Sequence, residues 1–111
     1  MFKKSERLGR ANFNEYFKIG RRSQSINFTL VFSPTLKFGT AVVVGKKVFK
    51  DAVDRNRLRR RVYSITRIYF LEQKIHTGIY LIIAKPTAKK LERKAIKIEM
   101  TNLLALATKA R

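Results

Sequence analysis

The chain has 111 residues, which fits one domain with one modest hydrophobic core. It carries 26 lysines and arginines against seven acidic residues, for a formal net charge of +19, and 45% of its residues are hydrophobic, which excludes a disordered chain. The absence of cysteine excludes disulfide scaffolds, thiol nucleophiles and cysteine metal sites. So large an excess of positive charge points to nucleic acid as the partner, before a membrane or an acidic protein.

The location and domain organisation follow from what the sequence lacks. No apolar run is long enough to span a bilayer, and the basic start of the chain is not followed by the apolar segment of a signal peptide. We therefore expect a cytoplasmic protein with no membrane partner. Because there is no repeat, low-complexity tract or long linker, a single RNA-binding domain is predicted over residues 1–111, with residues 1–11 as a basic, flexible N-terminus.

The first predicted element is a short aromatic helix. Asn12 is a candidate N-cap, Phe13, Tyr16 and Phe17 follow at helical spacing, and Gly20 ends the element. Phe13 and Phe17 lie one turn apart on the same side. As core residues they would pack against a sheet, since phenylalanine side chains are more often buried than exposed. As exposed rings they would form a stacking platform for unpaired bases.

Two strands are predicted next, after a basic link at residues 21–25 that has room for a short edge strand. Residues 26–33 form a half-buried strand that Pro34 ends, and residues 40–44 form a β-branched strand buried on both sides. The short link between them predicts an antiparallel hairpin. The first strand's buried face is expected to carry alternate residues, namely Ile26, Phe28, Leu30 and Phe32.

A long helix is predicted to follow the hairpin. Its apolar face recurs at helical spacing, its N-cap is Asp51, and Gly78 suits the left-handed position just past a helix end. The apolar face consists of Leu58, Val62, Ile65 and Tyr69.

The stretch from Lys46 to Arg67 concentrates positive charge, and only Asp51 and Asp54 oppose it. Charge this dense favours a phosphate-binding surface over an ordinary solvated helix face. On a helical wheel, Arg57 lies toward one edge of the polar side. The side opposite the apolar face carries Asn56, Arg59, Arg60 and Arg67.

The end of the chain predicts one more strand and one more helix. Residues 78–84 read as a buried strand, and a strand-helix-strand order implies a crossover that lays this strand parallel to a neighbour. Thr87 is a candidate cap for the final helix. The stripe of that helix toward the sheet is predicted to be Leu91, Ala95 and Ile98, extended by Ala88 and Leu106. The whole order is α-β-β-α-β-α.

Catalytic chemistry is not visible in the sequence. The seven carboxylates form no pair or metal cluster by spacing, and His76 stands alone, so it reads as an ordinary histidine. The segment from Gly39 to Lys47 ends like a phosphate loop but lacks the G-x-x-x-x-G-K-[ST] order. We therefore expect a nucleic-acid binder with no catalytic residue and no metal ligand of its own.

One motif resembles a known family. The pattern G-K-K-V-x-K-x-A-V-x-R-N-R-x-R-R, from Gly45 to Arg60, resembles the RNR signature of bacterial ribonuclease P protein subunits. The pair Arg7-Leu8, the spacing from Phe13 to Gly20, the strand from Ile79 to Pro86 and the chain length are also similar to that family, so the resemblance covers nearly the whole chain.

The resemblance implies a fold and an activity. The fold is an α/β (α+β) two-layer sandwich whose central, mostly antiparallel sheet contains a left-handed β-α-β crossover, where the general rule would give a right-handed one. The activity is that of an endoribonuclease subunit, with the catalytic centre on an RNA partner, the ribonuclease P RNA. That RNA uses Mg²⁺, bound mainly by the RNA itself, to remove the 5′ leader of precursor tRNA. No small-molecule substrate is implied.

The resemblance also implies site residues. Phe13 and Phe17 match an aromatic cleft that takes the leader; the alignment puts Val31 at the sheet side of that cleft, and the neighbouring Phe32 is the predicted third aromatic. The residues predicted to bind RNA are Lys46, Lys47, Lys50, Arg55, Asn56, Arg57, Arg59, Arg60 and Arg67.

Three other functions remain as alternatives. A ribosomal or other structural RNA-binding protein would explain the charge but not the RNR spacing. A helix-turn-helix DNA-binding module fits poorly with the predicted strands. A nuclease that acts without an RNA would need metal ligands that the sequence does not offer.

Overall fold

A four-stranded sheet with helices on both faces makes up residues 10–109, the part of the chain that the computed structural model describes. The predicted order of long helices and strands is confirmed, and the expected edge strand is present as β1. The elements are α1 (Arg10–Ile19), β1 (Arg21–Gln24), β2 (Phe28–Ser33), β3 (Phe38–Val43), α2 (Ala52–Glu72), β4 (Gly78–Ala84), the 3-10 helix η2 (Pro86–Lys90) and α3 (Arg93–Lys109).

The N-terminal predictions are only partly covered. Residues 1–9, with most of the expected flexible segment and the Arg7-Leu8 pair, lie outside the described residues. Residues 10 and 11 belong to α1, and Asn12 lies inside this helix instead of capping it.

The strands are arranged in the order β1-β2-β4-β3. The pairs β1–β2 and β2–β4 are antiparallel, and β3 pairs with β4 in parallel. The predicted hairpin between residues 26–33 and 40–44 is therefore wrong, because β4 lies between these two strands. β4 is the most apolar strand, and its burial on both faces suits the centre of the sheet.

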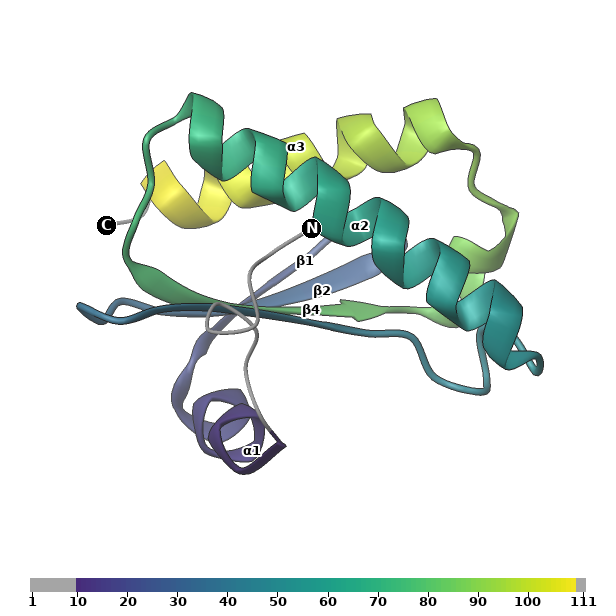
Figure 1. Ribbon diagram of the computed structural model, residues 1–111, viewed down its shortest axis with the longest axis horizontal. Helices are drawn as coiled ribbons and strands as arrows, with labels where there is room; N and C mark the ends of the chain where they lie inside the picture. The colour runs from purple at the N-terminus through teal and green to yellow at the C-terminus, as the bar shows by residue number, and fades with distance from the viewer. Residues whose placement is uncertain (1–9, 110–111) are drawn as a thin grey trace.

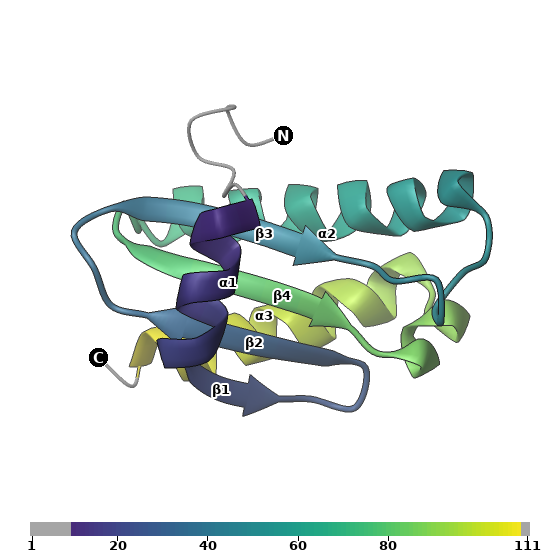
Figure 2. The same cartoon turned by 90° about the horizontal axis from the view of Figure 1, so that it is seen from below.

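The crossover from β3 through α2 to β4 is left-handed. In Figure 2, which views the sheet from the α1 side, β3 runs to the right, α2 returns behind the sheet, and β4 lies below β3. This path turns opposite to the usual right-handed connection. The handedness implied by the family resemblance is confirmed, and so is the α+β class.

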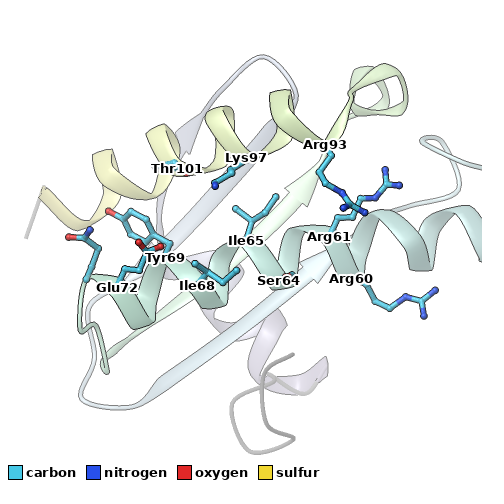
Figure 3. Close-up of a pocket in the computed structure, with 11 residues that line it drawn as sticks. Arg60, Arg61, Ser64, Ile65, Ile68, Tyr69, Glu72, Arg93, Lys97 and Thr101 are labelled. Carbon is cyan, nitrogen blue, oxygen red and sulfur yellow. The ribbon is translucent and has the colours of Figure 1, made fainter.

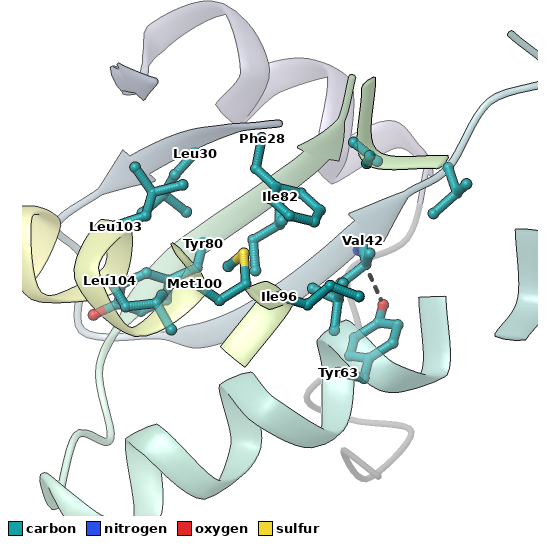
Figure 4. Packing of buried hydrophobic residues seen from close by; sticks show 14 of the residues in the cluster. Phe28, Leu30, Val42, Tyr63, Tyr80, Ile82, Ile96, Met100, Leu103 and Leu104 are labelled. Atoms are coloured by element: carbon teal, nitrogen blue, oxygen red, sulfur yellow. Dashed lines mark hydrogen bonds between the residues drawn. The ribbon is translucent and has the colours of Figure 1, made fainter. Parts of the chain in front are cut away.

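The main core lies between the sheet and the two long helices α2 and α3 (Figure 4). β2 and β4 supply alternate side chains, and each helix supplies one stripe. Tyr63 of α2 also accepts a hydrogen bond from the backbone N–H of Val42 at 3.3 Å, which pins this helix over the edge strand β3. The fully buried members include Phe28, Leu30, Val62, Tyr80, Ile82, Ile96, Met100, Leu103 and Leu104.

The predicted stripe of the last helix is confirmed only in part. Ala88 lies in the main core and Leu91 packs against it, but Ile98 and Leu106 are 64% and 63% exposed. The buried stripe of α3 is formed by Ile96, Met100, Leu103 and Leu104. Leu91, with φ −79° and ψ 135°, lies in an extended turn between η2 and α3, so it does not set the phase of the helix. Thr87 lies within η2 and does not cap α3.

A second, smaller core lies on the other face of the sheet, under α1. It is built from Val31, Ala41, Ile79 and Leu81, with three aromatic side chains of α1 packed against them. β2 is thus buried on both faces, where half-burial was predicted, and Ile26 precedes this strand and is 81% exposed. α1 adds a partial layer to the two-layer arrangement (Figure 1).

The ends of α2 differ in part from prediction. Asp51 occupies the N-cap position, but its side chain makes no capping hydrogen bond. At the other end the left-handed residue is Lys74, with φ 56°, while Gly78 begins β4. The backbone N–H of Ile75 donates to the carbonyl of Phe70 at 2.9 Å, and that of Lys74 donates to Leu71 at 3.3 Å, which is a Schellman motif.

Candidate nucleic-acid interface

Positive charge collects where β3 passes into α2. Lys46, Lys47 and Lys50 are exposed in this link, as is Arg57 on the first turns of the helix. Arg57 Nη1 lies 4.0 Å from Asp54 Oδ1, and both side chains are well exposed, so this ion pair is weak and leaves the cation open to an anionic ligand.

Arg55 has a structural task that the sequence did not predict. Its Nη1 donates to the backbone carbonyls of Phe49 at 3.0 Å and Lys50 at 2.7 Å. The side chain therefore holds the turn that leads into α2. Its main role is therefore to position the exposed lysines of the link, and binding of a phosphate is secondary.

Asn56 positions its neighbour one turn along. Arg59 Nη1 donates to the Asn56 Oδ1 at 2.5 Å. This contact uses the oxygen of the amide, and the amide nitrogen remains a donor that suits a phosphate oxygen. The pair presents two donor groups in a fixed relation.

The predicted basic ridge follows one side of α2. Tyr63 contacts β3, and Asn56, Arg59 and Arg67 lie four or seven residues from it, so they share its side of the helix. Arg60 lies four residues from Asn56 and seven from Arg67, so it belongs to the same ridge, and it also lines the edge of a groove between α2 and α3 on the second side of the helix.

Basic residues missed by the sequence analysis lie on that second side. Arg61 lines the same groove as Arg60, together with Arg93 and Lys97 of α3. It also lines a smaller pocket with Arg57 and Lys89. The repeat of basic residues at positions 93 and 97, one helical turn apart, was the signal that could have shown these residues.

The aromatic residues of α1 are both core and surface. Phe13 and Phe17 stack with ring centroids 5.7 Å apart and are half-buried against the small core. The guanidinium carbon of Arg22 lies 4.2 Å from the centroid of the Phe17 ring, and its Nη2 donates to the Phe17 carbonyl at 3.2 Å. The result is a short column of flat groups that a base could extend.

α1 sits unusually close to the sheet because of Gly20. A Cβ at this position would lie 2.4 Å from Val31 Cγ1 and 2.9 Å from the Tyr16 carbonyl oxygen. A larger residue would push the end of α1 away from β2. Gly20 therefore sets the height of the aromatic column above the sheet.

The prediction for Phe32 is wrong. This side chain is 3% exposed and lies in the main core beside Tyr80, with ring centroids 5.0 Å apart, on the face opposite α1. Neighbouring residues of a strand point to opposite faces, so only Val31 faces α1, and it is buried there. No aromatic side chain of β2 faces the α1 side within the described residues.

Among residues 10–109, no helix covers the part of the sheet beside α1 (Figure 2). The next row beyond the Val31 row is formed by paired positions of β3, β4 and β2, namely Val43, Ile83 and Thr29. All three are partly or well exposed. The link that carries the exposed lysines lies at the same end of the sheet, where β3 and β4 finish.

The described residues offer neither a metal site nor a membrane-spanning helix. Between residues 10 and 109, no group of three or more histidine or acidic side chains is placed to hold a metal ion. None of the helices in the described region is both long and apolar enough to cross a membrane.

The fold and the charge define a small α+β protein that presents cations around one helix and flat aromatic groups on the opposite face of the sheet. The chain belongs to the ribonuclease P protein family, whose family model, Ribonuclease P, matches residues 2–108. It is 32% identical to the ribonuclease P protein component of Lactobacillus gasseri over 86% of this chain and 80% of that protein. It is 34% identical to the component of Nitratiruptor sp., covering 83% and 82%.

Solved structures support the fold. The Staphylococcus aureus RNase P protein superposes with a TM-score of 0.76 at 23% identity, over 94% of this chain and 96% of that one. The Thermotoga maritima RNase P protein gives a TM-score of 0.71 at 24% identity, also over 94% and 96%.

Proposed function

We propose that this chain is the protein subunit of ribonuclease P, and that it binds both the catalytic RNA and the 5′ leader of precursor tRNA. The observation that supports this most is the arrangement at one end of the sheet. There the exposed cations of the β3–α2 link lie at the end of the sheet where Val43 and Ile83 are partly exposed, and α1 packs the stacked rings of Phe13 and Phe17 on that same face of the sheet.

The two surfaces suit two different parts of an RNA. Lysines and arginines neutralise phosphates and gain affinity by releasing counterions, so the α2 side suits a folded RNA. Half-buried rings suit unpaired bases, because stacking needs a flat face and no particular base edge. The leader is single-stranded and absent from the product, so a grip on it favours the precursor.

Hydrolysis itself would take place on the RNA. The chain supplies cations and stacking groups, which bind and orient. Mg²⁺ bound by the RNA would supply the chemistry that activates water and stabilises the leaving oxygen. By lowering the repulsion between phosphates, the protein would reduce the Mg²⁺ concentration that the RNA needs to fold and bind substrate.

Reconstitution tests the proposal. The purified protein is added to a bacterial ribonuclease P RNA at low Mg²⁺, and release of the 5′ leader from a labelled precursor tRNA is measured. We expect cleavage only when both components are present. Unchanged cleavage with the protein would contradict the subunit role, and co-purification with ribosomal subunits would favour the structural RNA-binding alternative.

The arginines of α2 can be separated by their contacts. Arg57→Ala should weaken binding of the catalytic RNA and reduce the slope of log affinity against log salt by roughly one unit, as expected for one lost phosphate contact. Arg55→Ala should act mainly through the turn it holds, lowering stability with a smaller change in slope. Equal slopes for the wild type and Arg57→Ala would show that Arg57 does not contact a phosphate of the RNA.

A further inference from the structure

A groove of about 650 Å³ runs between α2 and α3, on the face of the sheet opposite α1 (Figure 3). The aromatic column lies across the sheet from it and the lysines of the β3–α2 link do not line it, so it shares only Arg60 with the surfaces used above. Its volume lies within the range of pockets that hold one small organic group.

The floor of the groove is apolar and firmly held. Ile65 and Tyr69 of α2 pack against the main core, while Ile68 is 50% exposed along the groove. The Tyr69 hydroxyl shares a hydrogen bond of 3.2 Å with Thr108 of α3, and its ring meets Phe70 edge-on with centroids 6.0 Å apart. The floor is thus in place before any ligand arrives.

The rim is cationic at one end. Arg60 and Arg61 of α2 and Arg93 and Lys97 of α3 line the groove, and the one carboxylate among the lining residues is Glu72. Figure 3 shows Glu72 beside Tyr69, at the other end from Arg61 and Arg93. Two guanidinium groups on facing helices suit an anion with several oxygens, because each can bind two of them at once.

We propose that this groove is a second RNA site, which takes a nucleotide of a single strand with its phosphate between Arg61 and Arg93 and its base over Ile65 and Tyr69. An apolar floor that includes an aromatic ring and lies beside arginines is a composition by which proteins hold unpaired nucleotides. An acidic protein segment would match the cations but would leave the apolar floor without a flat partner.

The inference rests on the proposed function only in taking RNA as the ligand. Because the groove lies on the far side of the sheet from Phe13 and Phe17, one strand cannot fill both sites without passing around the molecule. The groove would therefore hold a different segment from the leader.

Methyl NMR of the full chain tests the site without catalytic RNA or precursor. Pentauridylate is titrated into protein labelled at isoleucine methyl groups, and the shifts of Ile65 and Ile68 are followed. We expect saturable shifts at both. The double variant Arg93→Ala/Lys97→Ala should weaken this binding about tenfold and flatten its salt slope by about 0.7, the contribution of one single-strand phosphate contact.

A matched control removes the same charge elsewhere. Lys90 and Lys94 are exposed and do not line the groove, so Lys90→Ala/Lys94→Ala should leave the shifts of Ile65 and Ile68 nearly unchanged. Ile68→Glu places a carboxylate on the floor at a half-exposed position, so the fold is kept, and it should abolish the binding.

Several results would overturn the proposal. These are the absence of shifts at Ile65 and Ile68 under saturating pentauridylate, equal losses in the groove and control variants, or shifts produced only by an acidic peptide, which would make the groove a protein-binding site. Groove binding together with failed reconstitution would retain this site and reject the subunit role. Successful reconstitution without groove binding would retain the subunit role and reject this site.

Discussion

The two faces of the sheet are built for different purposes. The face under α2 and α3 carries the large core, and two long helices cover it. The face under α1 carries four buried aliphatic side chains and one short helix, with Val43 and Ile83 partly exposed beside it. The difference teaches that one face supplies most of the stability, so the other is left free to expose aromatic rings.

The largest expected effect compares matched residues of β4. Ile82 and Ile79 are 0% and 2% exposed and point to opposite faces. Ile82→Ala should cost about 4 kcal/mol of unfolding free energy and Ile79→Ala about 2 kcal/mol, because the single helix α1 can settle into the cavity more easily than two packed helices. Urea denaturation measures both. Equal losses of unfolding free energy would contradict the inferred difference in packing between the two faces of the sheet.

The second effect concerns binding of precursor tRNA by the side of the sheet that α1 covers. Phe17→Ala should weaken binding of precursor tRNA about tenfold, since stacking contributes about 1–3 kcal/mol per base, while binding of mature tRNA stays the same. Fluorescence titration with both RNAs measures this. Ile19→Ala, which shortens a 67% exposed side chain of the same helix, serves as control. Parallel losses for both RNAs would show that Phe17 supports the fold and not the leader.

The third effect concerns the hydrogen bonds that attach α3 to the loop between β1 and β2, on the side of the sheet that carries the main core. Glu99 of α3 accepts hydrogen bonds from the Asn27 backbone N–H at 2.8 Å and the Asn27 side chain at 2.7 Å, and from the Ser25 hydroxyl. Burial raises the pKa of the Glu99 carboxyl, but these hydrogen bonds and the charge of Lys85 outweigh it and hold the pKa below its ordinary value of 4.5.

Glu99→Gln should therefore cost about 1–2 kcal/mol of unfolding free energy at pH 7. Because the folded pKa is depressed, the contribution of Glu99 is complete above pH 4.5 and is lost as pH falls through the lower folded value. Urea midpoints of the two proteins should converge on acidification. A constant difference down to pH 2 would show that the hydrogen bonds do not depend on the charge.

The smallest effect is a gain. Lys74 has φ 56°, a conformation that glycine adopts without strain, so Lys74→Gly should raise stability by about 0.5–1 kcal/mol. Gln73→Gly, at a neighbouring position with φ −87°, should lower it, and thermal unfolding of the two variants tests the sign. A loss in both would mean that the Lys74 side chain contributes more than its backbone strain costs.

Sequence patterns predicted the secondary structure of each segment better than they predicted which segments lie side by side. Residues 78–84 are a strand as predicted, because seven consecutive apolar or small residues suit no exposed element. Their insertion between β2 and β3 was missed, since loop length favours pairing of consecutive strands and carries no information about a later strand. The phase of α3 was missed because a 3-10 turn at Pro86 changed where the helix begins.

The candidate site shows the same limit. The density of basic residues located the α2 region, yet Arg55 and Arg57 are the same residue type two positions apart, and only the fold shows that Arg55 holds a backbone turn. The alignment placed Val31 on the side of the sheet that faces α1, as the fold does, but Phe32 was chosen for its aromatic ring, and the alternation of side chains along β2 puts that ring on the opposite face. The spacing of Arg93 and Lys97 indicates one basic side of α3, but only the packing of α3 against α2 brings these residues beside Arg61.

The central position of β4 has a consequence for biosynthesis. Strand β2 has no partner but β1, and β3 has none at all, until the ribosome has made the whole of α2 and the strand after it. Hydrogen bonds between distant segments form slowly because loop closure must precede them. The arginine-rich segment of α2 is therefore synthesised before the sheet can be completed, and a polyanion bound to this segment would relieve its charge repulsion until β4 is in place.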